Sequence, residues 1–503
     1  MNQRKLGVIL SYASMGITIL SNFIYVPILL HFVSQEEYGV YQIMGSMIAY
    51  LAVMDFGLSN TIIRYYSGCL AHQDEKGKEN VLAISSIIYG GIAVIATVVC
   101  IGAYQFIDVF YNSSLTAYEL TLAKQIYVIL AINVVLSIPS HIFSAVIQSH
   151  EKFVFYKGIV IVQAILQPII IIAVMYQNPN VVYIAMIQMV LNVCVIVCNI
   201  FYCMKKIHIK IKLHFWDKDM LKEMLGFAFF IFLGTIVDQV NLKTDQMILG
   251  AVIGAGAAAV YSISSQLQMA FMNFSTCINN VFLPRISMLA AQNDDMKALN
   301  ELFIKVGRIQ LYVILYIYGG FLVLGELFIT KVWVGEAYKD AYWFTVIVMT
   351  SIIIPLSQNT GIFILQAKNK HAFRSILYTI FAVIHFGAAI ILAKCWGGIG
   401  CALAMAATQV IGNTIIINIY YKKKIGINVE KYYYNLIKML PFFVVSIGVG
   451  IICKQILNYS LINFILIGVI YSVVYVLLFI KFVFNDYEKQ LVFKYIRKKD
   501  SKR

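Results

Sequence analysis

One stretch of the chain places ionisable and amide side chains inside an otherwise apolar run, at residues 237–246. At about 100° per residue, one face of a helix here holds Asp238, Asn241 and Asp245. The adjoining face holds Gln239, Lys243 and Gln246. Ionisable groups inside an apolar run usually face a protein interior or water. The pattern predicts the wall of an aqueous cavity, where Lys243 can attract an anion and a carboxylate can carry a proton or a sodium ion.

An alternative interpretation is that these groups only lock their helix to its neighbours. Asp238 and Lys243 are five residues apart. They therefore do not face each other within one helix, because helical neighbours are three or four positions apart. Any structural pairing would have to be interhelical, and both interpretations remain open at this stage.

Isolated polar residues in other apolar runs are further candidates. Arg64 lies at the end of its run, where it would either meet an anionic group or serve as a charge anchor at a membrane surface. Asp55 precedes it in the same run, and capping or a cavity wall explains it equally well. His141 and His385 are interpreted as buried, satisfied histidines. The amides Asn22, Gln266, Asn273 and Asn279 are either ligand contacts or hydrogen-bonding links between helices.

The elements that carry these residues follow from composition. The chain has 503 residues, of which 61% are hydrophobic and 13% are charged. A soluble domain has about 45–50% apolar and about 25% charged residues. The composition therefore indicates a membrane protein, with no polar stretch long enough to form a soluble catalytic domain.

Apolar runs long enough to cross a bilayer as helices recur along the whole chain. A spanning helix needs about 20 mostly apolar residues, and runs of this length are too long for barrel strands. We predict an all-α polytopic membrane protein with about fourteen spans. Their approximate ranges are 7–33, 38–60, 81–107, 122–148, 155–176, 181–204, 224–249, 257–282, 306–330, 342–366, 373–394, 398–421, 436–457 and 461–484.

Charge is distributed unevenly between the two sides of these spans. If both termini are cytoplasmic, most of the 39 basic residues fall in cytoplasmic connections, as the positive-inside rule requires. The net charge of +15 is explained in this way, and nucleic acid is not an expected partner. The opposite side holds Lys124, Lys331, Lys339, Lys394 and Lys454.

An internal repeat relates the first six spans to the next six. Gly39-Val40-Tyr41 returns as Ala259-Val260-Tyr261, about 220 positions later. Lys205-Lys206-Ile207 returns as Lys423-Lys424-Ile425. Because six is an even number of spans, both copies enter the membrane in the same orientation. We therefore predict lobes at 1–215 and 216–430, followed by two extra helices and a basic tail at 431–503.

Several motifs resemble polysaccharide-type flippases of the multidrug/oligosaccharidyl-lipid/polysaccharide exporter superfamily. They are Pro27-Ile28-Leu29-Leu30, Glu37-Tyr38-Gly39-Val40-Tyr41, Asp55-Phe56-Gly57-Leu58-Ser59, Asp245-Gln246-Met247-Ile248-Leu249-Gly250 and Leu283-Pro284-Arg285-Ile286-Ser287. The resemblance implies two six-helix lobes in a V around a cavity with alternating access, lined by spans 1, 2, 7 and 8. Lipid II flippases of this superfamily carry several arginines in spans 1 and 2, whereas here only Arg64 is present. That departure argues against lipid II as cargo.

The resemblance implies transport of a polyprenyl-diphosphate-linked oligosaccharide across the cytoplasmic membrane, and no enzymatic activity. Lys243 and Arg64 would then bind the diphosphate. The amides Asn22, Gln266, Asn273 and Asn279, together with Asn241, would bind the sugars. Asp238, Asp245 or Asp55 would carry a coupling proton or sodium ion, and no other cofactor or metal is expected. No phosphate-binding loop ending in Gly-Lys-Ser/Thr is present, so ATP is not the direct energy source. Alternative functions are an ion-coupled multidrug exporter and a membrane polysaccharide-processing enzyme. A polysaccharide polymerase or a glycosyltransferase is a further candidate partner.

Overall fold

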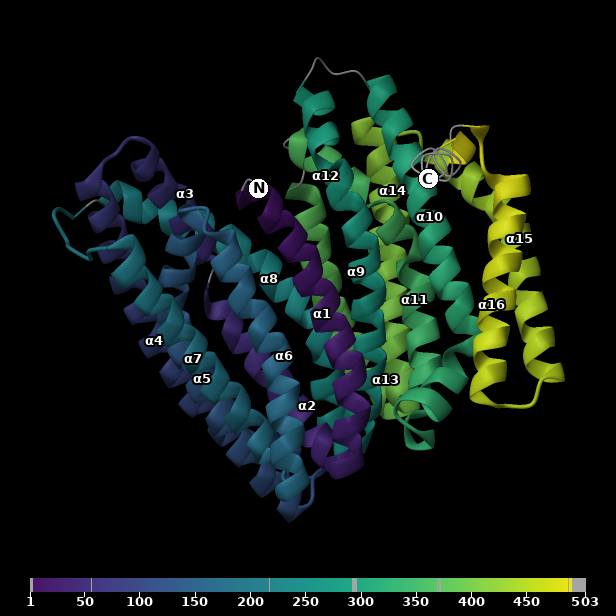
Figure 1. The fold of residues 1–503 in the computed structure, drawn as a ribbon, viewed down its shortest axis with the longest axis horizontal. Coiled ribbons are helices and arrows are strands. Elements are labelled where there is room, and N and C mark those ends of the chain that lie inside the picture. The colour runs from purple at the N-terminus through teal and green to yellow at the C-terminus, as the bar shows by residue number, and fades with distance from the viewer. Residues whose placement is uncertain are drawn as a thin grey trace, which may run out of the picture. The chain divides into compact units, whose positions relative to one another are not determined.

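A computed structural model describes residues 3–55, 57–216, 218–291, 296–368, 370, 372–486 and 488–490. Every regular element within these ranges is helical, which confirms the predicted all-α class (Figure 1). Helices satisfy their backbone groups internally, as hydrocarbon surroundings require.

The first part of the chain forms long helices joined by short connections. Ser34 and Glu37 form a capping box at the second helix, and Thr116 and Glu119 form one at the fifth, so the chain stops and restarts at defined residues. The elements are α1 (Gln3–Phe32), α2 (Gln35–Ala52), η1 (Val53–Asp55), α3 (Leu58–Ala71), α4 (Glu75–Tyr111), α5 (Ala117–Ser149), α6 (Phe153–Gln177), α7 (Val182–Tyr202), η2 (Cys203–Ile207) and α8 (Lys218–Val252).

The second part continues in the same way, with several short π-helical turns. Its elements are α9 (Ala255–Ala291), α10 (Met296–Leu327), η3 (Phe328–Trp333), η4 (Glu336–Tyr338), α11 (Ala341–Ser357), α12 (Asn359–Ala367), α13 (Ala372–Thr408), η5 (Gln409–Ile416), α14 (Ile417–Tyr420), η6 (Tyr421–Ile425), α15 (Val429–Ile456), α16 (Leu461–Leu478) and η7 (Phe479–Val483).

Eleven helical segments within the described residues are long and apolar enough to cross a membrane. One of them, Ala372–Ile425, contains two of the predicted spans, and the backbone between these leaves helical geometry at Gly397, where φ is 58°. The predicted seventh and eighth spans correspond to α8 and α9, some of whose side chains lie outside the described set. The total of about fourteen spans remains a prediction.

Large apolar side chains are exposed along these helices. Val109 is 74% exposed and Ile462 is 77% exposed, and many similar residues lie on other helices. Extensive apolar surface of this kind is unfavourable in water but natural in hydrocarbon. The chain is a multi-pass membrane protein.

Backbone packing divides the chain into two compact units. The first comprises Met1–Ser262 with Phe386–Cys401, and the second comprises Ile263–His385 with Ala402–Arg503. The predicted lobes rest on the sequence repeat rather than on packing, so their boundaries remain predictions.

In the first unit, α1 packs along α6, and α2 packs against both α5 and α8. The start of α2 also approaches the start of α9 very closely. A Cβ atom on Gly39 would lie 1.9 Å from the carbonyl oxygen of Ala255. Only glycine allows this approach, because a contact that short cannot be relieved without moving the backbone.

In the second unit, α10 packs against α11, α15 and α16. Tyrosines join these helices: the hydroxyl of Tyr471 donates to the carbonyl of Tyr316 at 2.9 Å, and that of Tyr475 donates to the carbonyl of Tyr312 at 2.8 Å. The two helices predicted to follow the repeat are therefore an integral part of this unit.

Candidate functional site

The polar stretch of α8 changes from exposed to buried over two helical turns. Asp238 is exposed, and Asn241 and Lys243 are half-buried. Asp245 and Gln246 are only 3% and 2% exposed. The predicted face of Asp238, Asn241 and Asp245 is thus not uniformly open, because the carboxyl-terminal turns of α8 pack inside the first unit.

A polar seam joins the buried part of α8 to α2. The hydroxyl of Ser46 donates to Oε1 of Gln246 at 2.6 Å, and the hydroxyls of Tyr50 and Thr244 are hydrogen-bonded to each other. Hydrogen bonds between buried polar groups offset the cost of their desolvation. The seam therefore fixes the rotation of α8 about its own axis, and with it the positions of Lys243 and Asn241.

Asp245 is held by the first turns of α9. The hydroxyl of Tyr261 donates a short hydrogen bond to its Oδ2. Because Tyr261 is itself 3% exposed, this carboxylate lies in a closed environment, in contrast to the exposed Asp238.

Lys243 is a half-buried cation that lies between Asp238 and Asp245 in the sequence of α8. Within the described part of the chain, its ammonium forms no ion pair with either of them or with any other acidic side chain. A cation in a low-dielectric environment attracts an anion much more strongly than one in water. The position of Lys243 is therefore suited to an anionic ligand.

A second polar cluster surrounds Asp55, where the chain turns between η1 and α3. The hydroxyl of Tyr89 donates to Oδ1 of Asp55 at 2.6 Å, and Nδ1 of His141 lies 3.2 Å from the same oxygen. Ser59 lies within hydrogen-bonding distance of all three of these side chains. The N-cap of α3 is Gly57, with no side-chain cap, so Asp55 does not cap this helix.

The Asp55 cluster remains partly open. The side chain of Asp55 is 19% exposed and that of His141 is 39% exposed. The interpretation of His141 as a buried histidine is therefore wrong: its side chain is partly exposed and lies beside a carboxylate. Only the packing of α5 against α3 brings the two together, so no pattern along the sequence identified the pair.

The remaining predicted residues differ in their exposure. Arg64 is exposed on α3, with its guanidinium carbon 5.8 Å from the ring centre of Tyr65. Gln266 and Asn273 are half-buried on α9, in the second unit. The side chain of Asn279 lies outside the described set. His385 is fully buried, which confirms that part of its interpretation.

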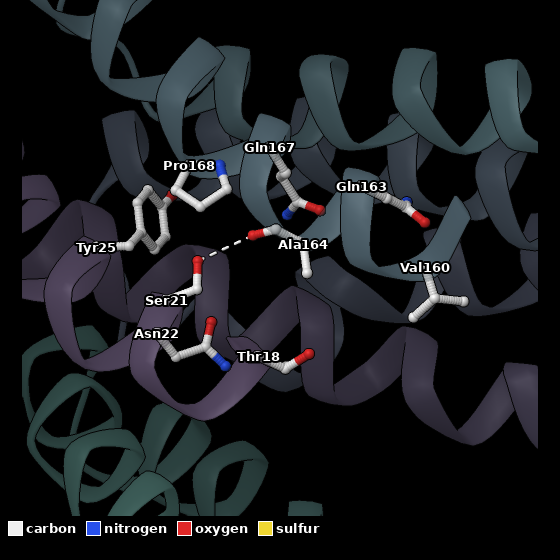
Figure 2. Close-up of a pocket in the computed structure, with 9 residues that line it drawn as sticks. All are labelled: Thr18, Ser21, Asn22, Tyr25, Val160, Gln163, Ala164, Gln167 and Pro168. Atoms are coloured by element: carbon white, nitrogen blue, oxygen red, sulfur yellow. Dashed lines mark hydrogen bonds between the residues drawn. The ribbon is translucent and has the colours of Figure 1, made fainter. Parts of the chain in front are cut away.

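Asn22 lines a pocket between α1 and α6 (Figure 2). Gln163 and Gln167, which were not among the predicted site residues, line the opposite wall. Their spacing was a usable signal, because two amides at positions i and i+4 lie on one face of an otherwise apolar helix.

Comparisons with known proteins agree with this architecture. The model of a protein family described as "Polysaccharide biosynthesis protein" matches residues 28–342. A Shigella flexneri protein named as an O-antigen transporter is 24% identical over 313 residues, which are 60% of this chain and 70% of that protein.

Solved structures show the same fold. Lipid II flippase MurJ, in an inward closed conformation, matches with a TM-score of 0.74 and 15% identity over 94% of this chain and 97% of its own. A multidrug resistance MATE family transporter of the MOP superfamily, in an inward-facing conformation, matches with a TM-score of 0.62 and 13% identity over 83% of this chain and 99% of its own. The predicted transporter fold is therefore confirmed.

Proposed function

Because the chain belongs to the family of polysaccharide biosynthesis proteins, we propose that it flips a polyprenyl-diphosphate-linked oligosaccharide across the cytoplasmic membrane. Such a cargo carries charges and many hydroxyl groups, for which hydrocarbon offers no partner. A polar path through the protein replaces that lost hydration. Alternating access would carry the head group across while the prenyl chain stays in lipid.

The environment of Lys243 is the observation that supports this proposal most strongly. It is half-buried on α8, and within the described residues no carboxylate neutralises it. A cation kept in this state is costly unless a ligand uses it. In the proposed mechanism, Lys243 binds the diphosphate. The seam formed by Ser46 and Gln246 holds Lys243 in position.

The other candidate residues have distinct proposed roles. Arg64, exposed on α3, would meet the phosphates at the cytoplasmic surface. Asn241 lies two positions before Lys243 on α8, on the face that it shares with Asp238, and would bind a sugar. Asn22, Gln266 and Asn273 are proposed as further sugar contacts.

Energy for the cycle is proposed to come from a proton or a sodium ion. Asp55 is the favoured site, because it is partly open and lies 3.2 Å from Nδ1 of His141. A carboxylate beside an imidazole can exchange a proton in response to pH. Asp238, which is exposed, and Asp245, which is closed in by Tyr261, are the alternative sites.

Topology and partners complete the proposal. The distribution of Lys and Arg favours two cytoplasmic termini. A flipped precursor has to be made by glycosyltransferases on one side of the membrane and polymerised on the other. Enzymes of both kinds are therefore proposed partners, and the chain itself is not proposed to catalyse a reaction.

Reconstituted vesicles test the proposal directly. Purified protein would be placed in liposomes containing a fluorescent polyprenyl-diphosphate-linked sugar, and flipping would be measured by access of an external quencher. Lys243→Ala should slow flipping about tenfold or more, because a hydrogen bond to a charged group contributes about 1.5–3 kcal/mol. Lys243→Arg should retain most of the rate, and Lys423→Ala, at an exposed lysine, is the matched control. Unchanged flipping in both Lys243→Ala and Asp238→Asn would contradict the assigned roles.

A multidrug exporter is the competing function, since a MATE family transporter shares the fold. The same vesicles would be loaded with a cationic dye under a proton gradient. We expect no dye movement, because an un-neutralised Lys243 repels cations. Dye export without flipping of the lipid-linked sugar would favour the competing function.

A further inference from the structure

The pocket between α1 and α6 is lined entirely by uncharged side chains (Figure 2). It has a volume of about 210 Å³. Its polar lining comes from Thr18, Ser21, Asn22 and Tyr25 on α1 and from Gln163 and Gln167 on α6. Six neutral hydrogen-bonding side chains inside a membrane protein form an unusual concentration, because such groups are costly in an apolar environment unless they are satisfied.

Several of these groups are available to a ligand. The hydroxyl of Tyr25 is buried and has no hydrogen-bond partner. Within the residues that the structure describes, the side-chain amides of Asn22, Gln163 and Gln167 are also without hydrogen bonds. Ser21 and Thr18 donate to the carbonyls of Ala164 and Ser14, both at 2.9 Å, but their oxygens can still accept. The pocket therefore offers both donors and acceptors.

The pocket lies on the side of α1 opposite an exposed apolar stripe. Leu20 and Ile24 are 64% and 63% exposed and form an apolar stripe, which marks the surface toward hydrocarbon. Asn22 is also exposed, but a residue two positions along a helix points about 200° away. A polar exposed stripe opposite an apolar exposed stripe indicates that the polar one contacts water or a polar ligand.

Helix α6 has the same arrangement. Val162 and Leu166 are 54% and 42% exposed, whereas Gln163 and Gln167 are half-buried and face α1. The six polar side chains from the two helices line one pocket, together with the apolar residues Val160, Ala164 and Pro168. This matched pattern is what a binding site between two helices requires.

We infer that this pocket binds one uncharged sugar unit of the cargo, separately from the diphosphate site at Lys243. Hydroxyl and amide groups can donate to and accept from a sugar hydroxyl, whereas no lining residue carries a charge to balance a phosphate. Its volume is below the about 300–1,000 Å³ of pockets for drug-sized ligands, so it fits one ring rather than a whole oligosaccharide. The inference rests on the proposed flippase function.

Two lipid probes separate the sugar from the diphosphate. Binding of bare polyprenyl diphosphate and of polyprenyl diphosphate carrying one neutral hexose would be measured on the purified full chain in lipid nanodiscs. The double variant Gln163→Leu/Gln167→Leu should bind the hexose-bearing lipid about tenfold more weakly, because two hydrogen bonds are lost. Its binding of the bare lipid should not change. Lys243→Ala should weaken binding of both lipids.

A second variant distinguishes a selective loss of sugar binding from a folding defect. Asn22→Leu removes an exposed amide from the other wall of the pocket and should have the same selective effect. Val162→Ala/Leu166→Ala, at exposed positions of α6 outside this pocket, is the matched control and should bind both probes as the parent does. The inference would be overturned if the pocket variants bound the hexose-bearing lipid as well as the parent does. It would also be overturned if well-folded pocket variants lost binding of both lipids equally. Neither result would contradict the flippase function. Failure of the parent to bind either lipid would overturn both.

Discussion

Arg308 in α10 forms two hydrogen bonds with the carboxylate of Glu488, one from Nε to Oε1 and one from Nη2 to Oε2, both at 2.8 Å. Tyr312 donates to the same carboxylate at 2.6 Å. The side chains of Arg308 and Glu488 are only 11% and 4% exposed. Because Glu488 lies shortly after η7, this buried pair fastens the end of the described chain to α10.

Breaking this pair should destabilise the protein. Glu488→Gln leaves the buried guanidinium without a counter-charge, a change that typically costs about 3–5 kcal/mol. We expect a clear fall in the midpoint of thermal unfolding in detergent. Glu430→Gln is the matched control, because Glu430 pairs with Lys422 on the surface and such pairs contribute about 0–1 kcal/mol. Equal midpoints for the two variants would show that the buried pair is not important for stability.

Ionisation of the Glu488 carboxylate should make the stability of the protein depend on pH. Burial opposes ionisation of Glu488, but the hydrogen bonds from Arg308 and Tyr312 outweigh it, so its pKa lies below the ordinary value. A lowered folded-state pKa means that this stabilisation is present above the unfolded pKa of about 4.3 and is lost as pH falls through the folded value. Unfolding midpoints of the parent should therefore fall more steeply below about pH 4.3 than those of Glu488→Gln. Parallel curves for the two proteins would exclude this linkage.

Asp55 and His141 should couple transport to a pH gradient. Asp55→Asn removes the group that accepts a proton but keeps a similar shape and a hydrogen bond from Tyr89. We expect flipping in vesicles to lose its dependence on an imposed proton gradient and to continue at the rate seen without one. His141→Gln should reduce that dependence in the same direction. Asp108→Asn is the control, because Asp108 pairs with Lys124 in a more exposed position. If the gradient response survived in Asp55→Asn, another residue would have to couple transport to the proton gradient.

Asn80 should hold the segment between the two repeats against α4. Its Oδ1 accepts from the backbone amides of His214 and Phe215 at 3.1 and 3.2 Å, and the side chain is 1% exposed. Asn80→Ala leaves both amides without this partner, and we expect their hydrogen exchange to accelerate about tenfold or more. Asn180→Ala removes a comparable cap from Val182 and should not change exchange at His214. Exchange that is unaffected by Asn80→Ala would show that other contacts hold this segment.

Much of the fold could be predicted because its determinants are local. An apolar run such as 81–107 must cross the membrane as a helix, and in the structure it lies within α4. The break predicted between 394 and 398 coincides with the left-handed φ of Gly397, which interrupts α13. Length, apolar content and a single glycine are all visible in the sequence itself.

The site was less predictable because its geometry depends on neighbouring helices. Helical periodicity placed Asp238 and Asp245 on one face of α8, but only the packing of α2 and α9 makes one exposed and the other buried. The 3.2 Å distance between Asp55 and Nδ1 of His141 likewise depends on the packing of α5 beside α3, which no local pattern predicts. The arrangement of two lobes in a V remains a prediction.

The close approach at Gly39 affects how variant libraries should be interpreted. Any side chain at this position would push α2 away from the Ala255 carbonyl, whereas a Cβ at Gly16 would have no atom within 4 Å. A saturation screen scored by export will therefore deplete almost every substitution at residue 39 and tolerate many at residue 16. Intolerance at residue 39 reflects the spacing of two backbones and should not be counted among cargo contacts.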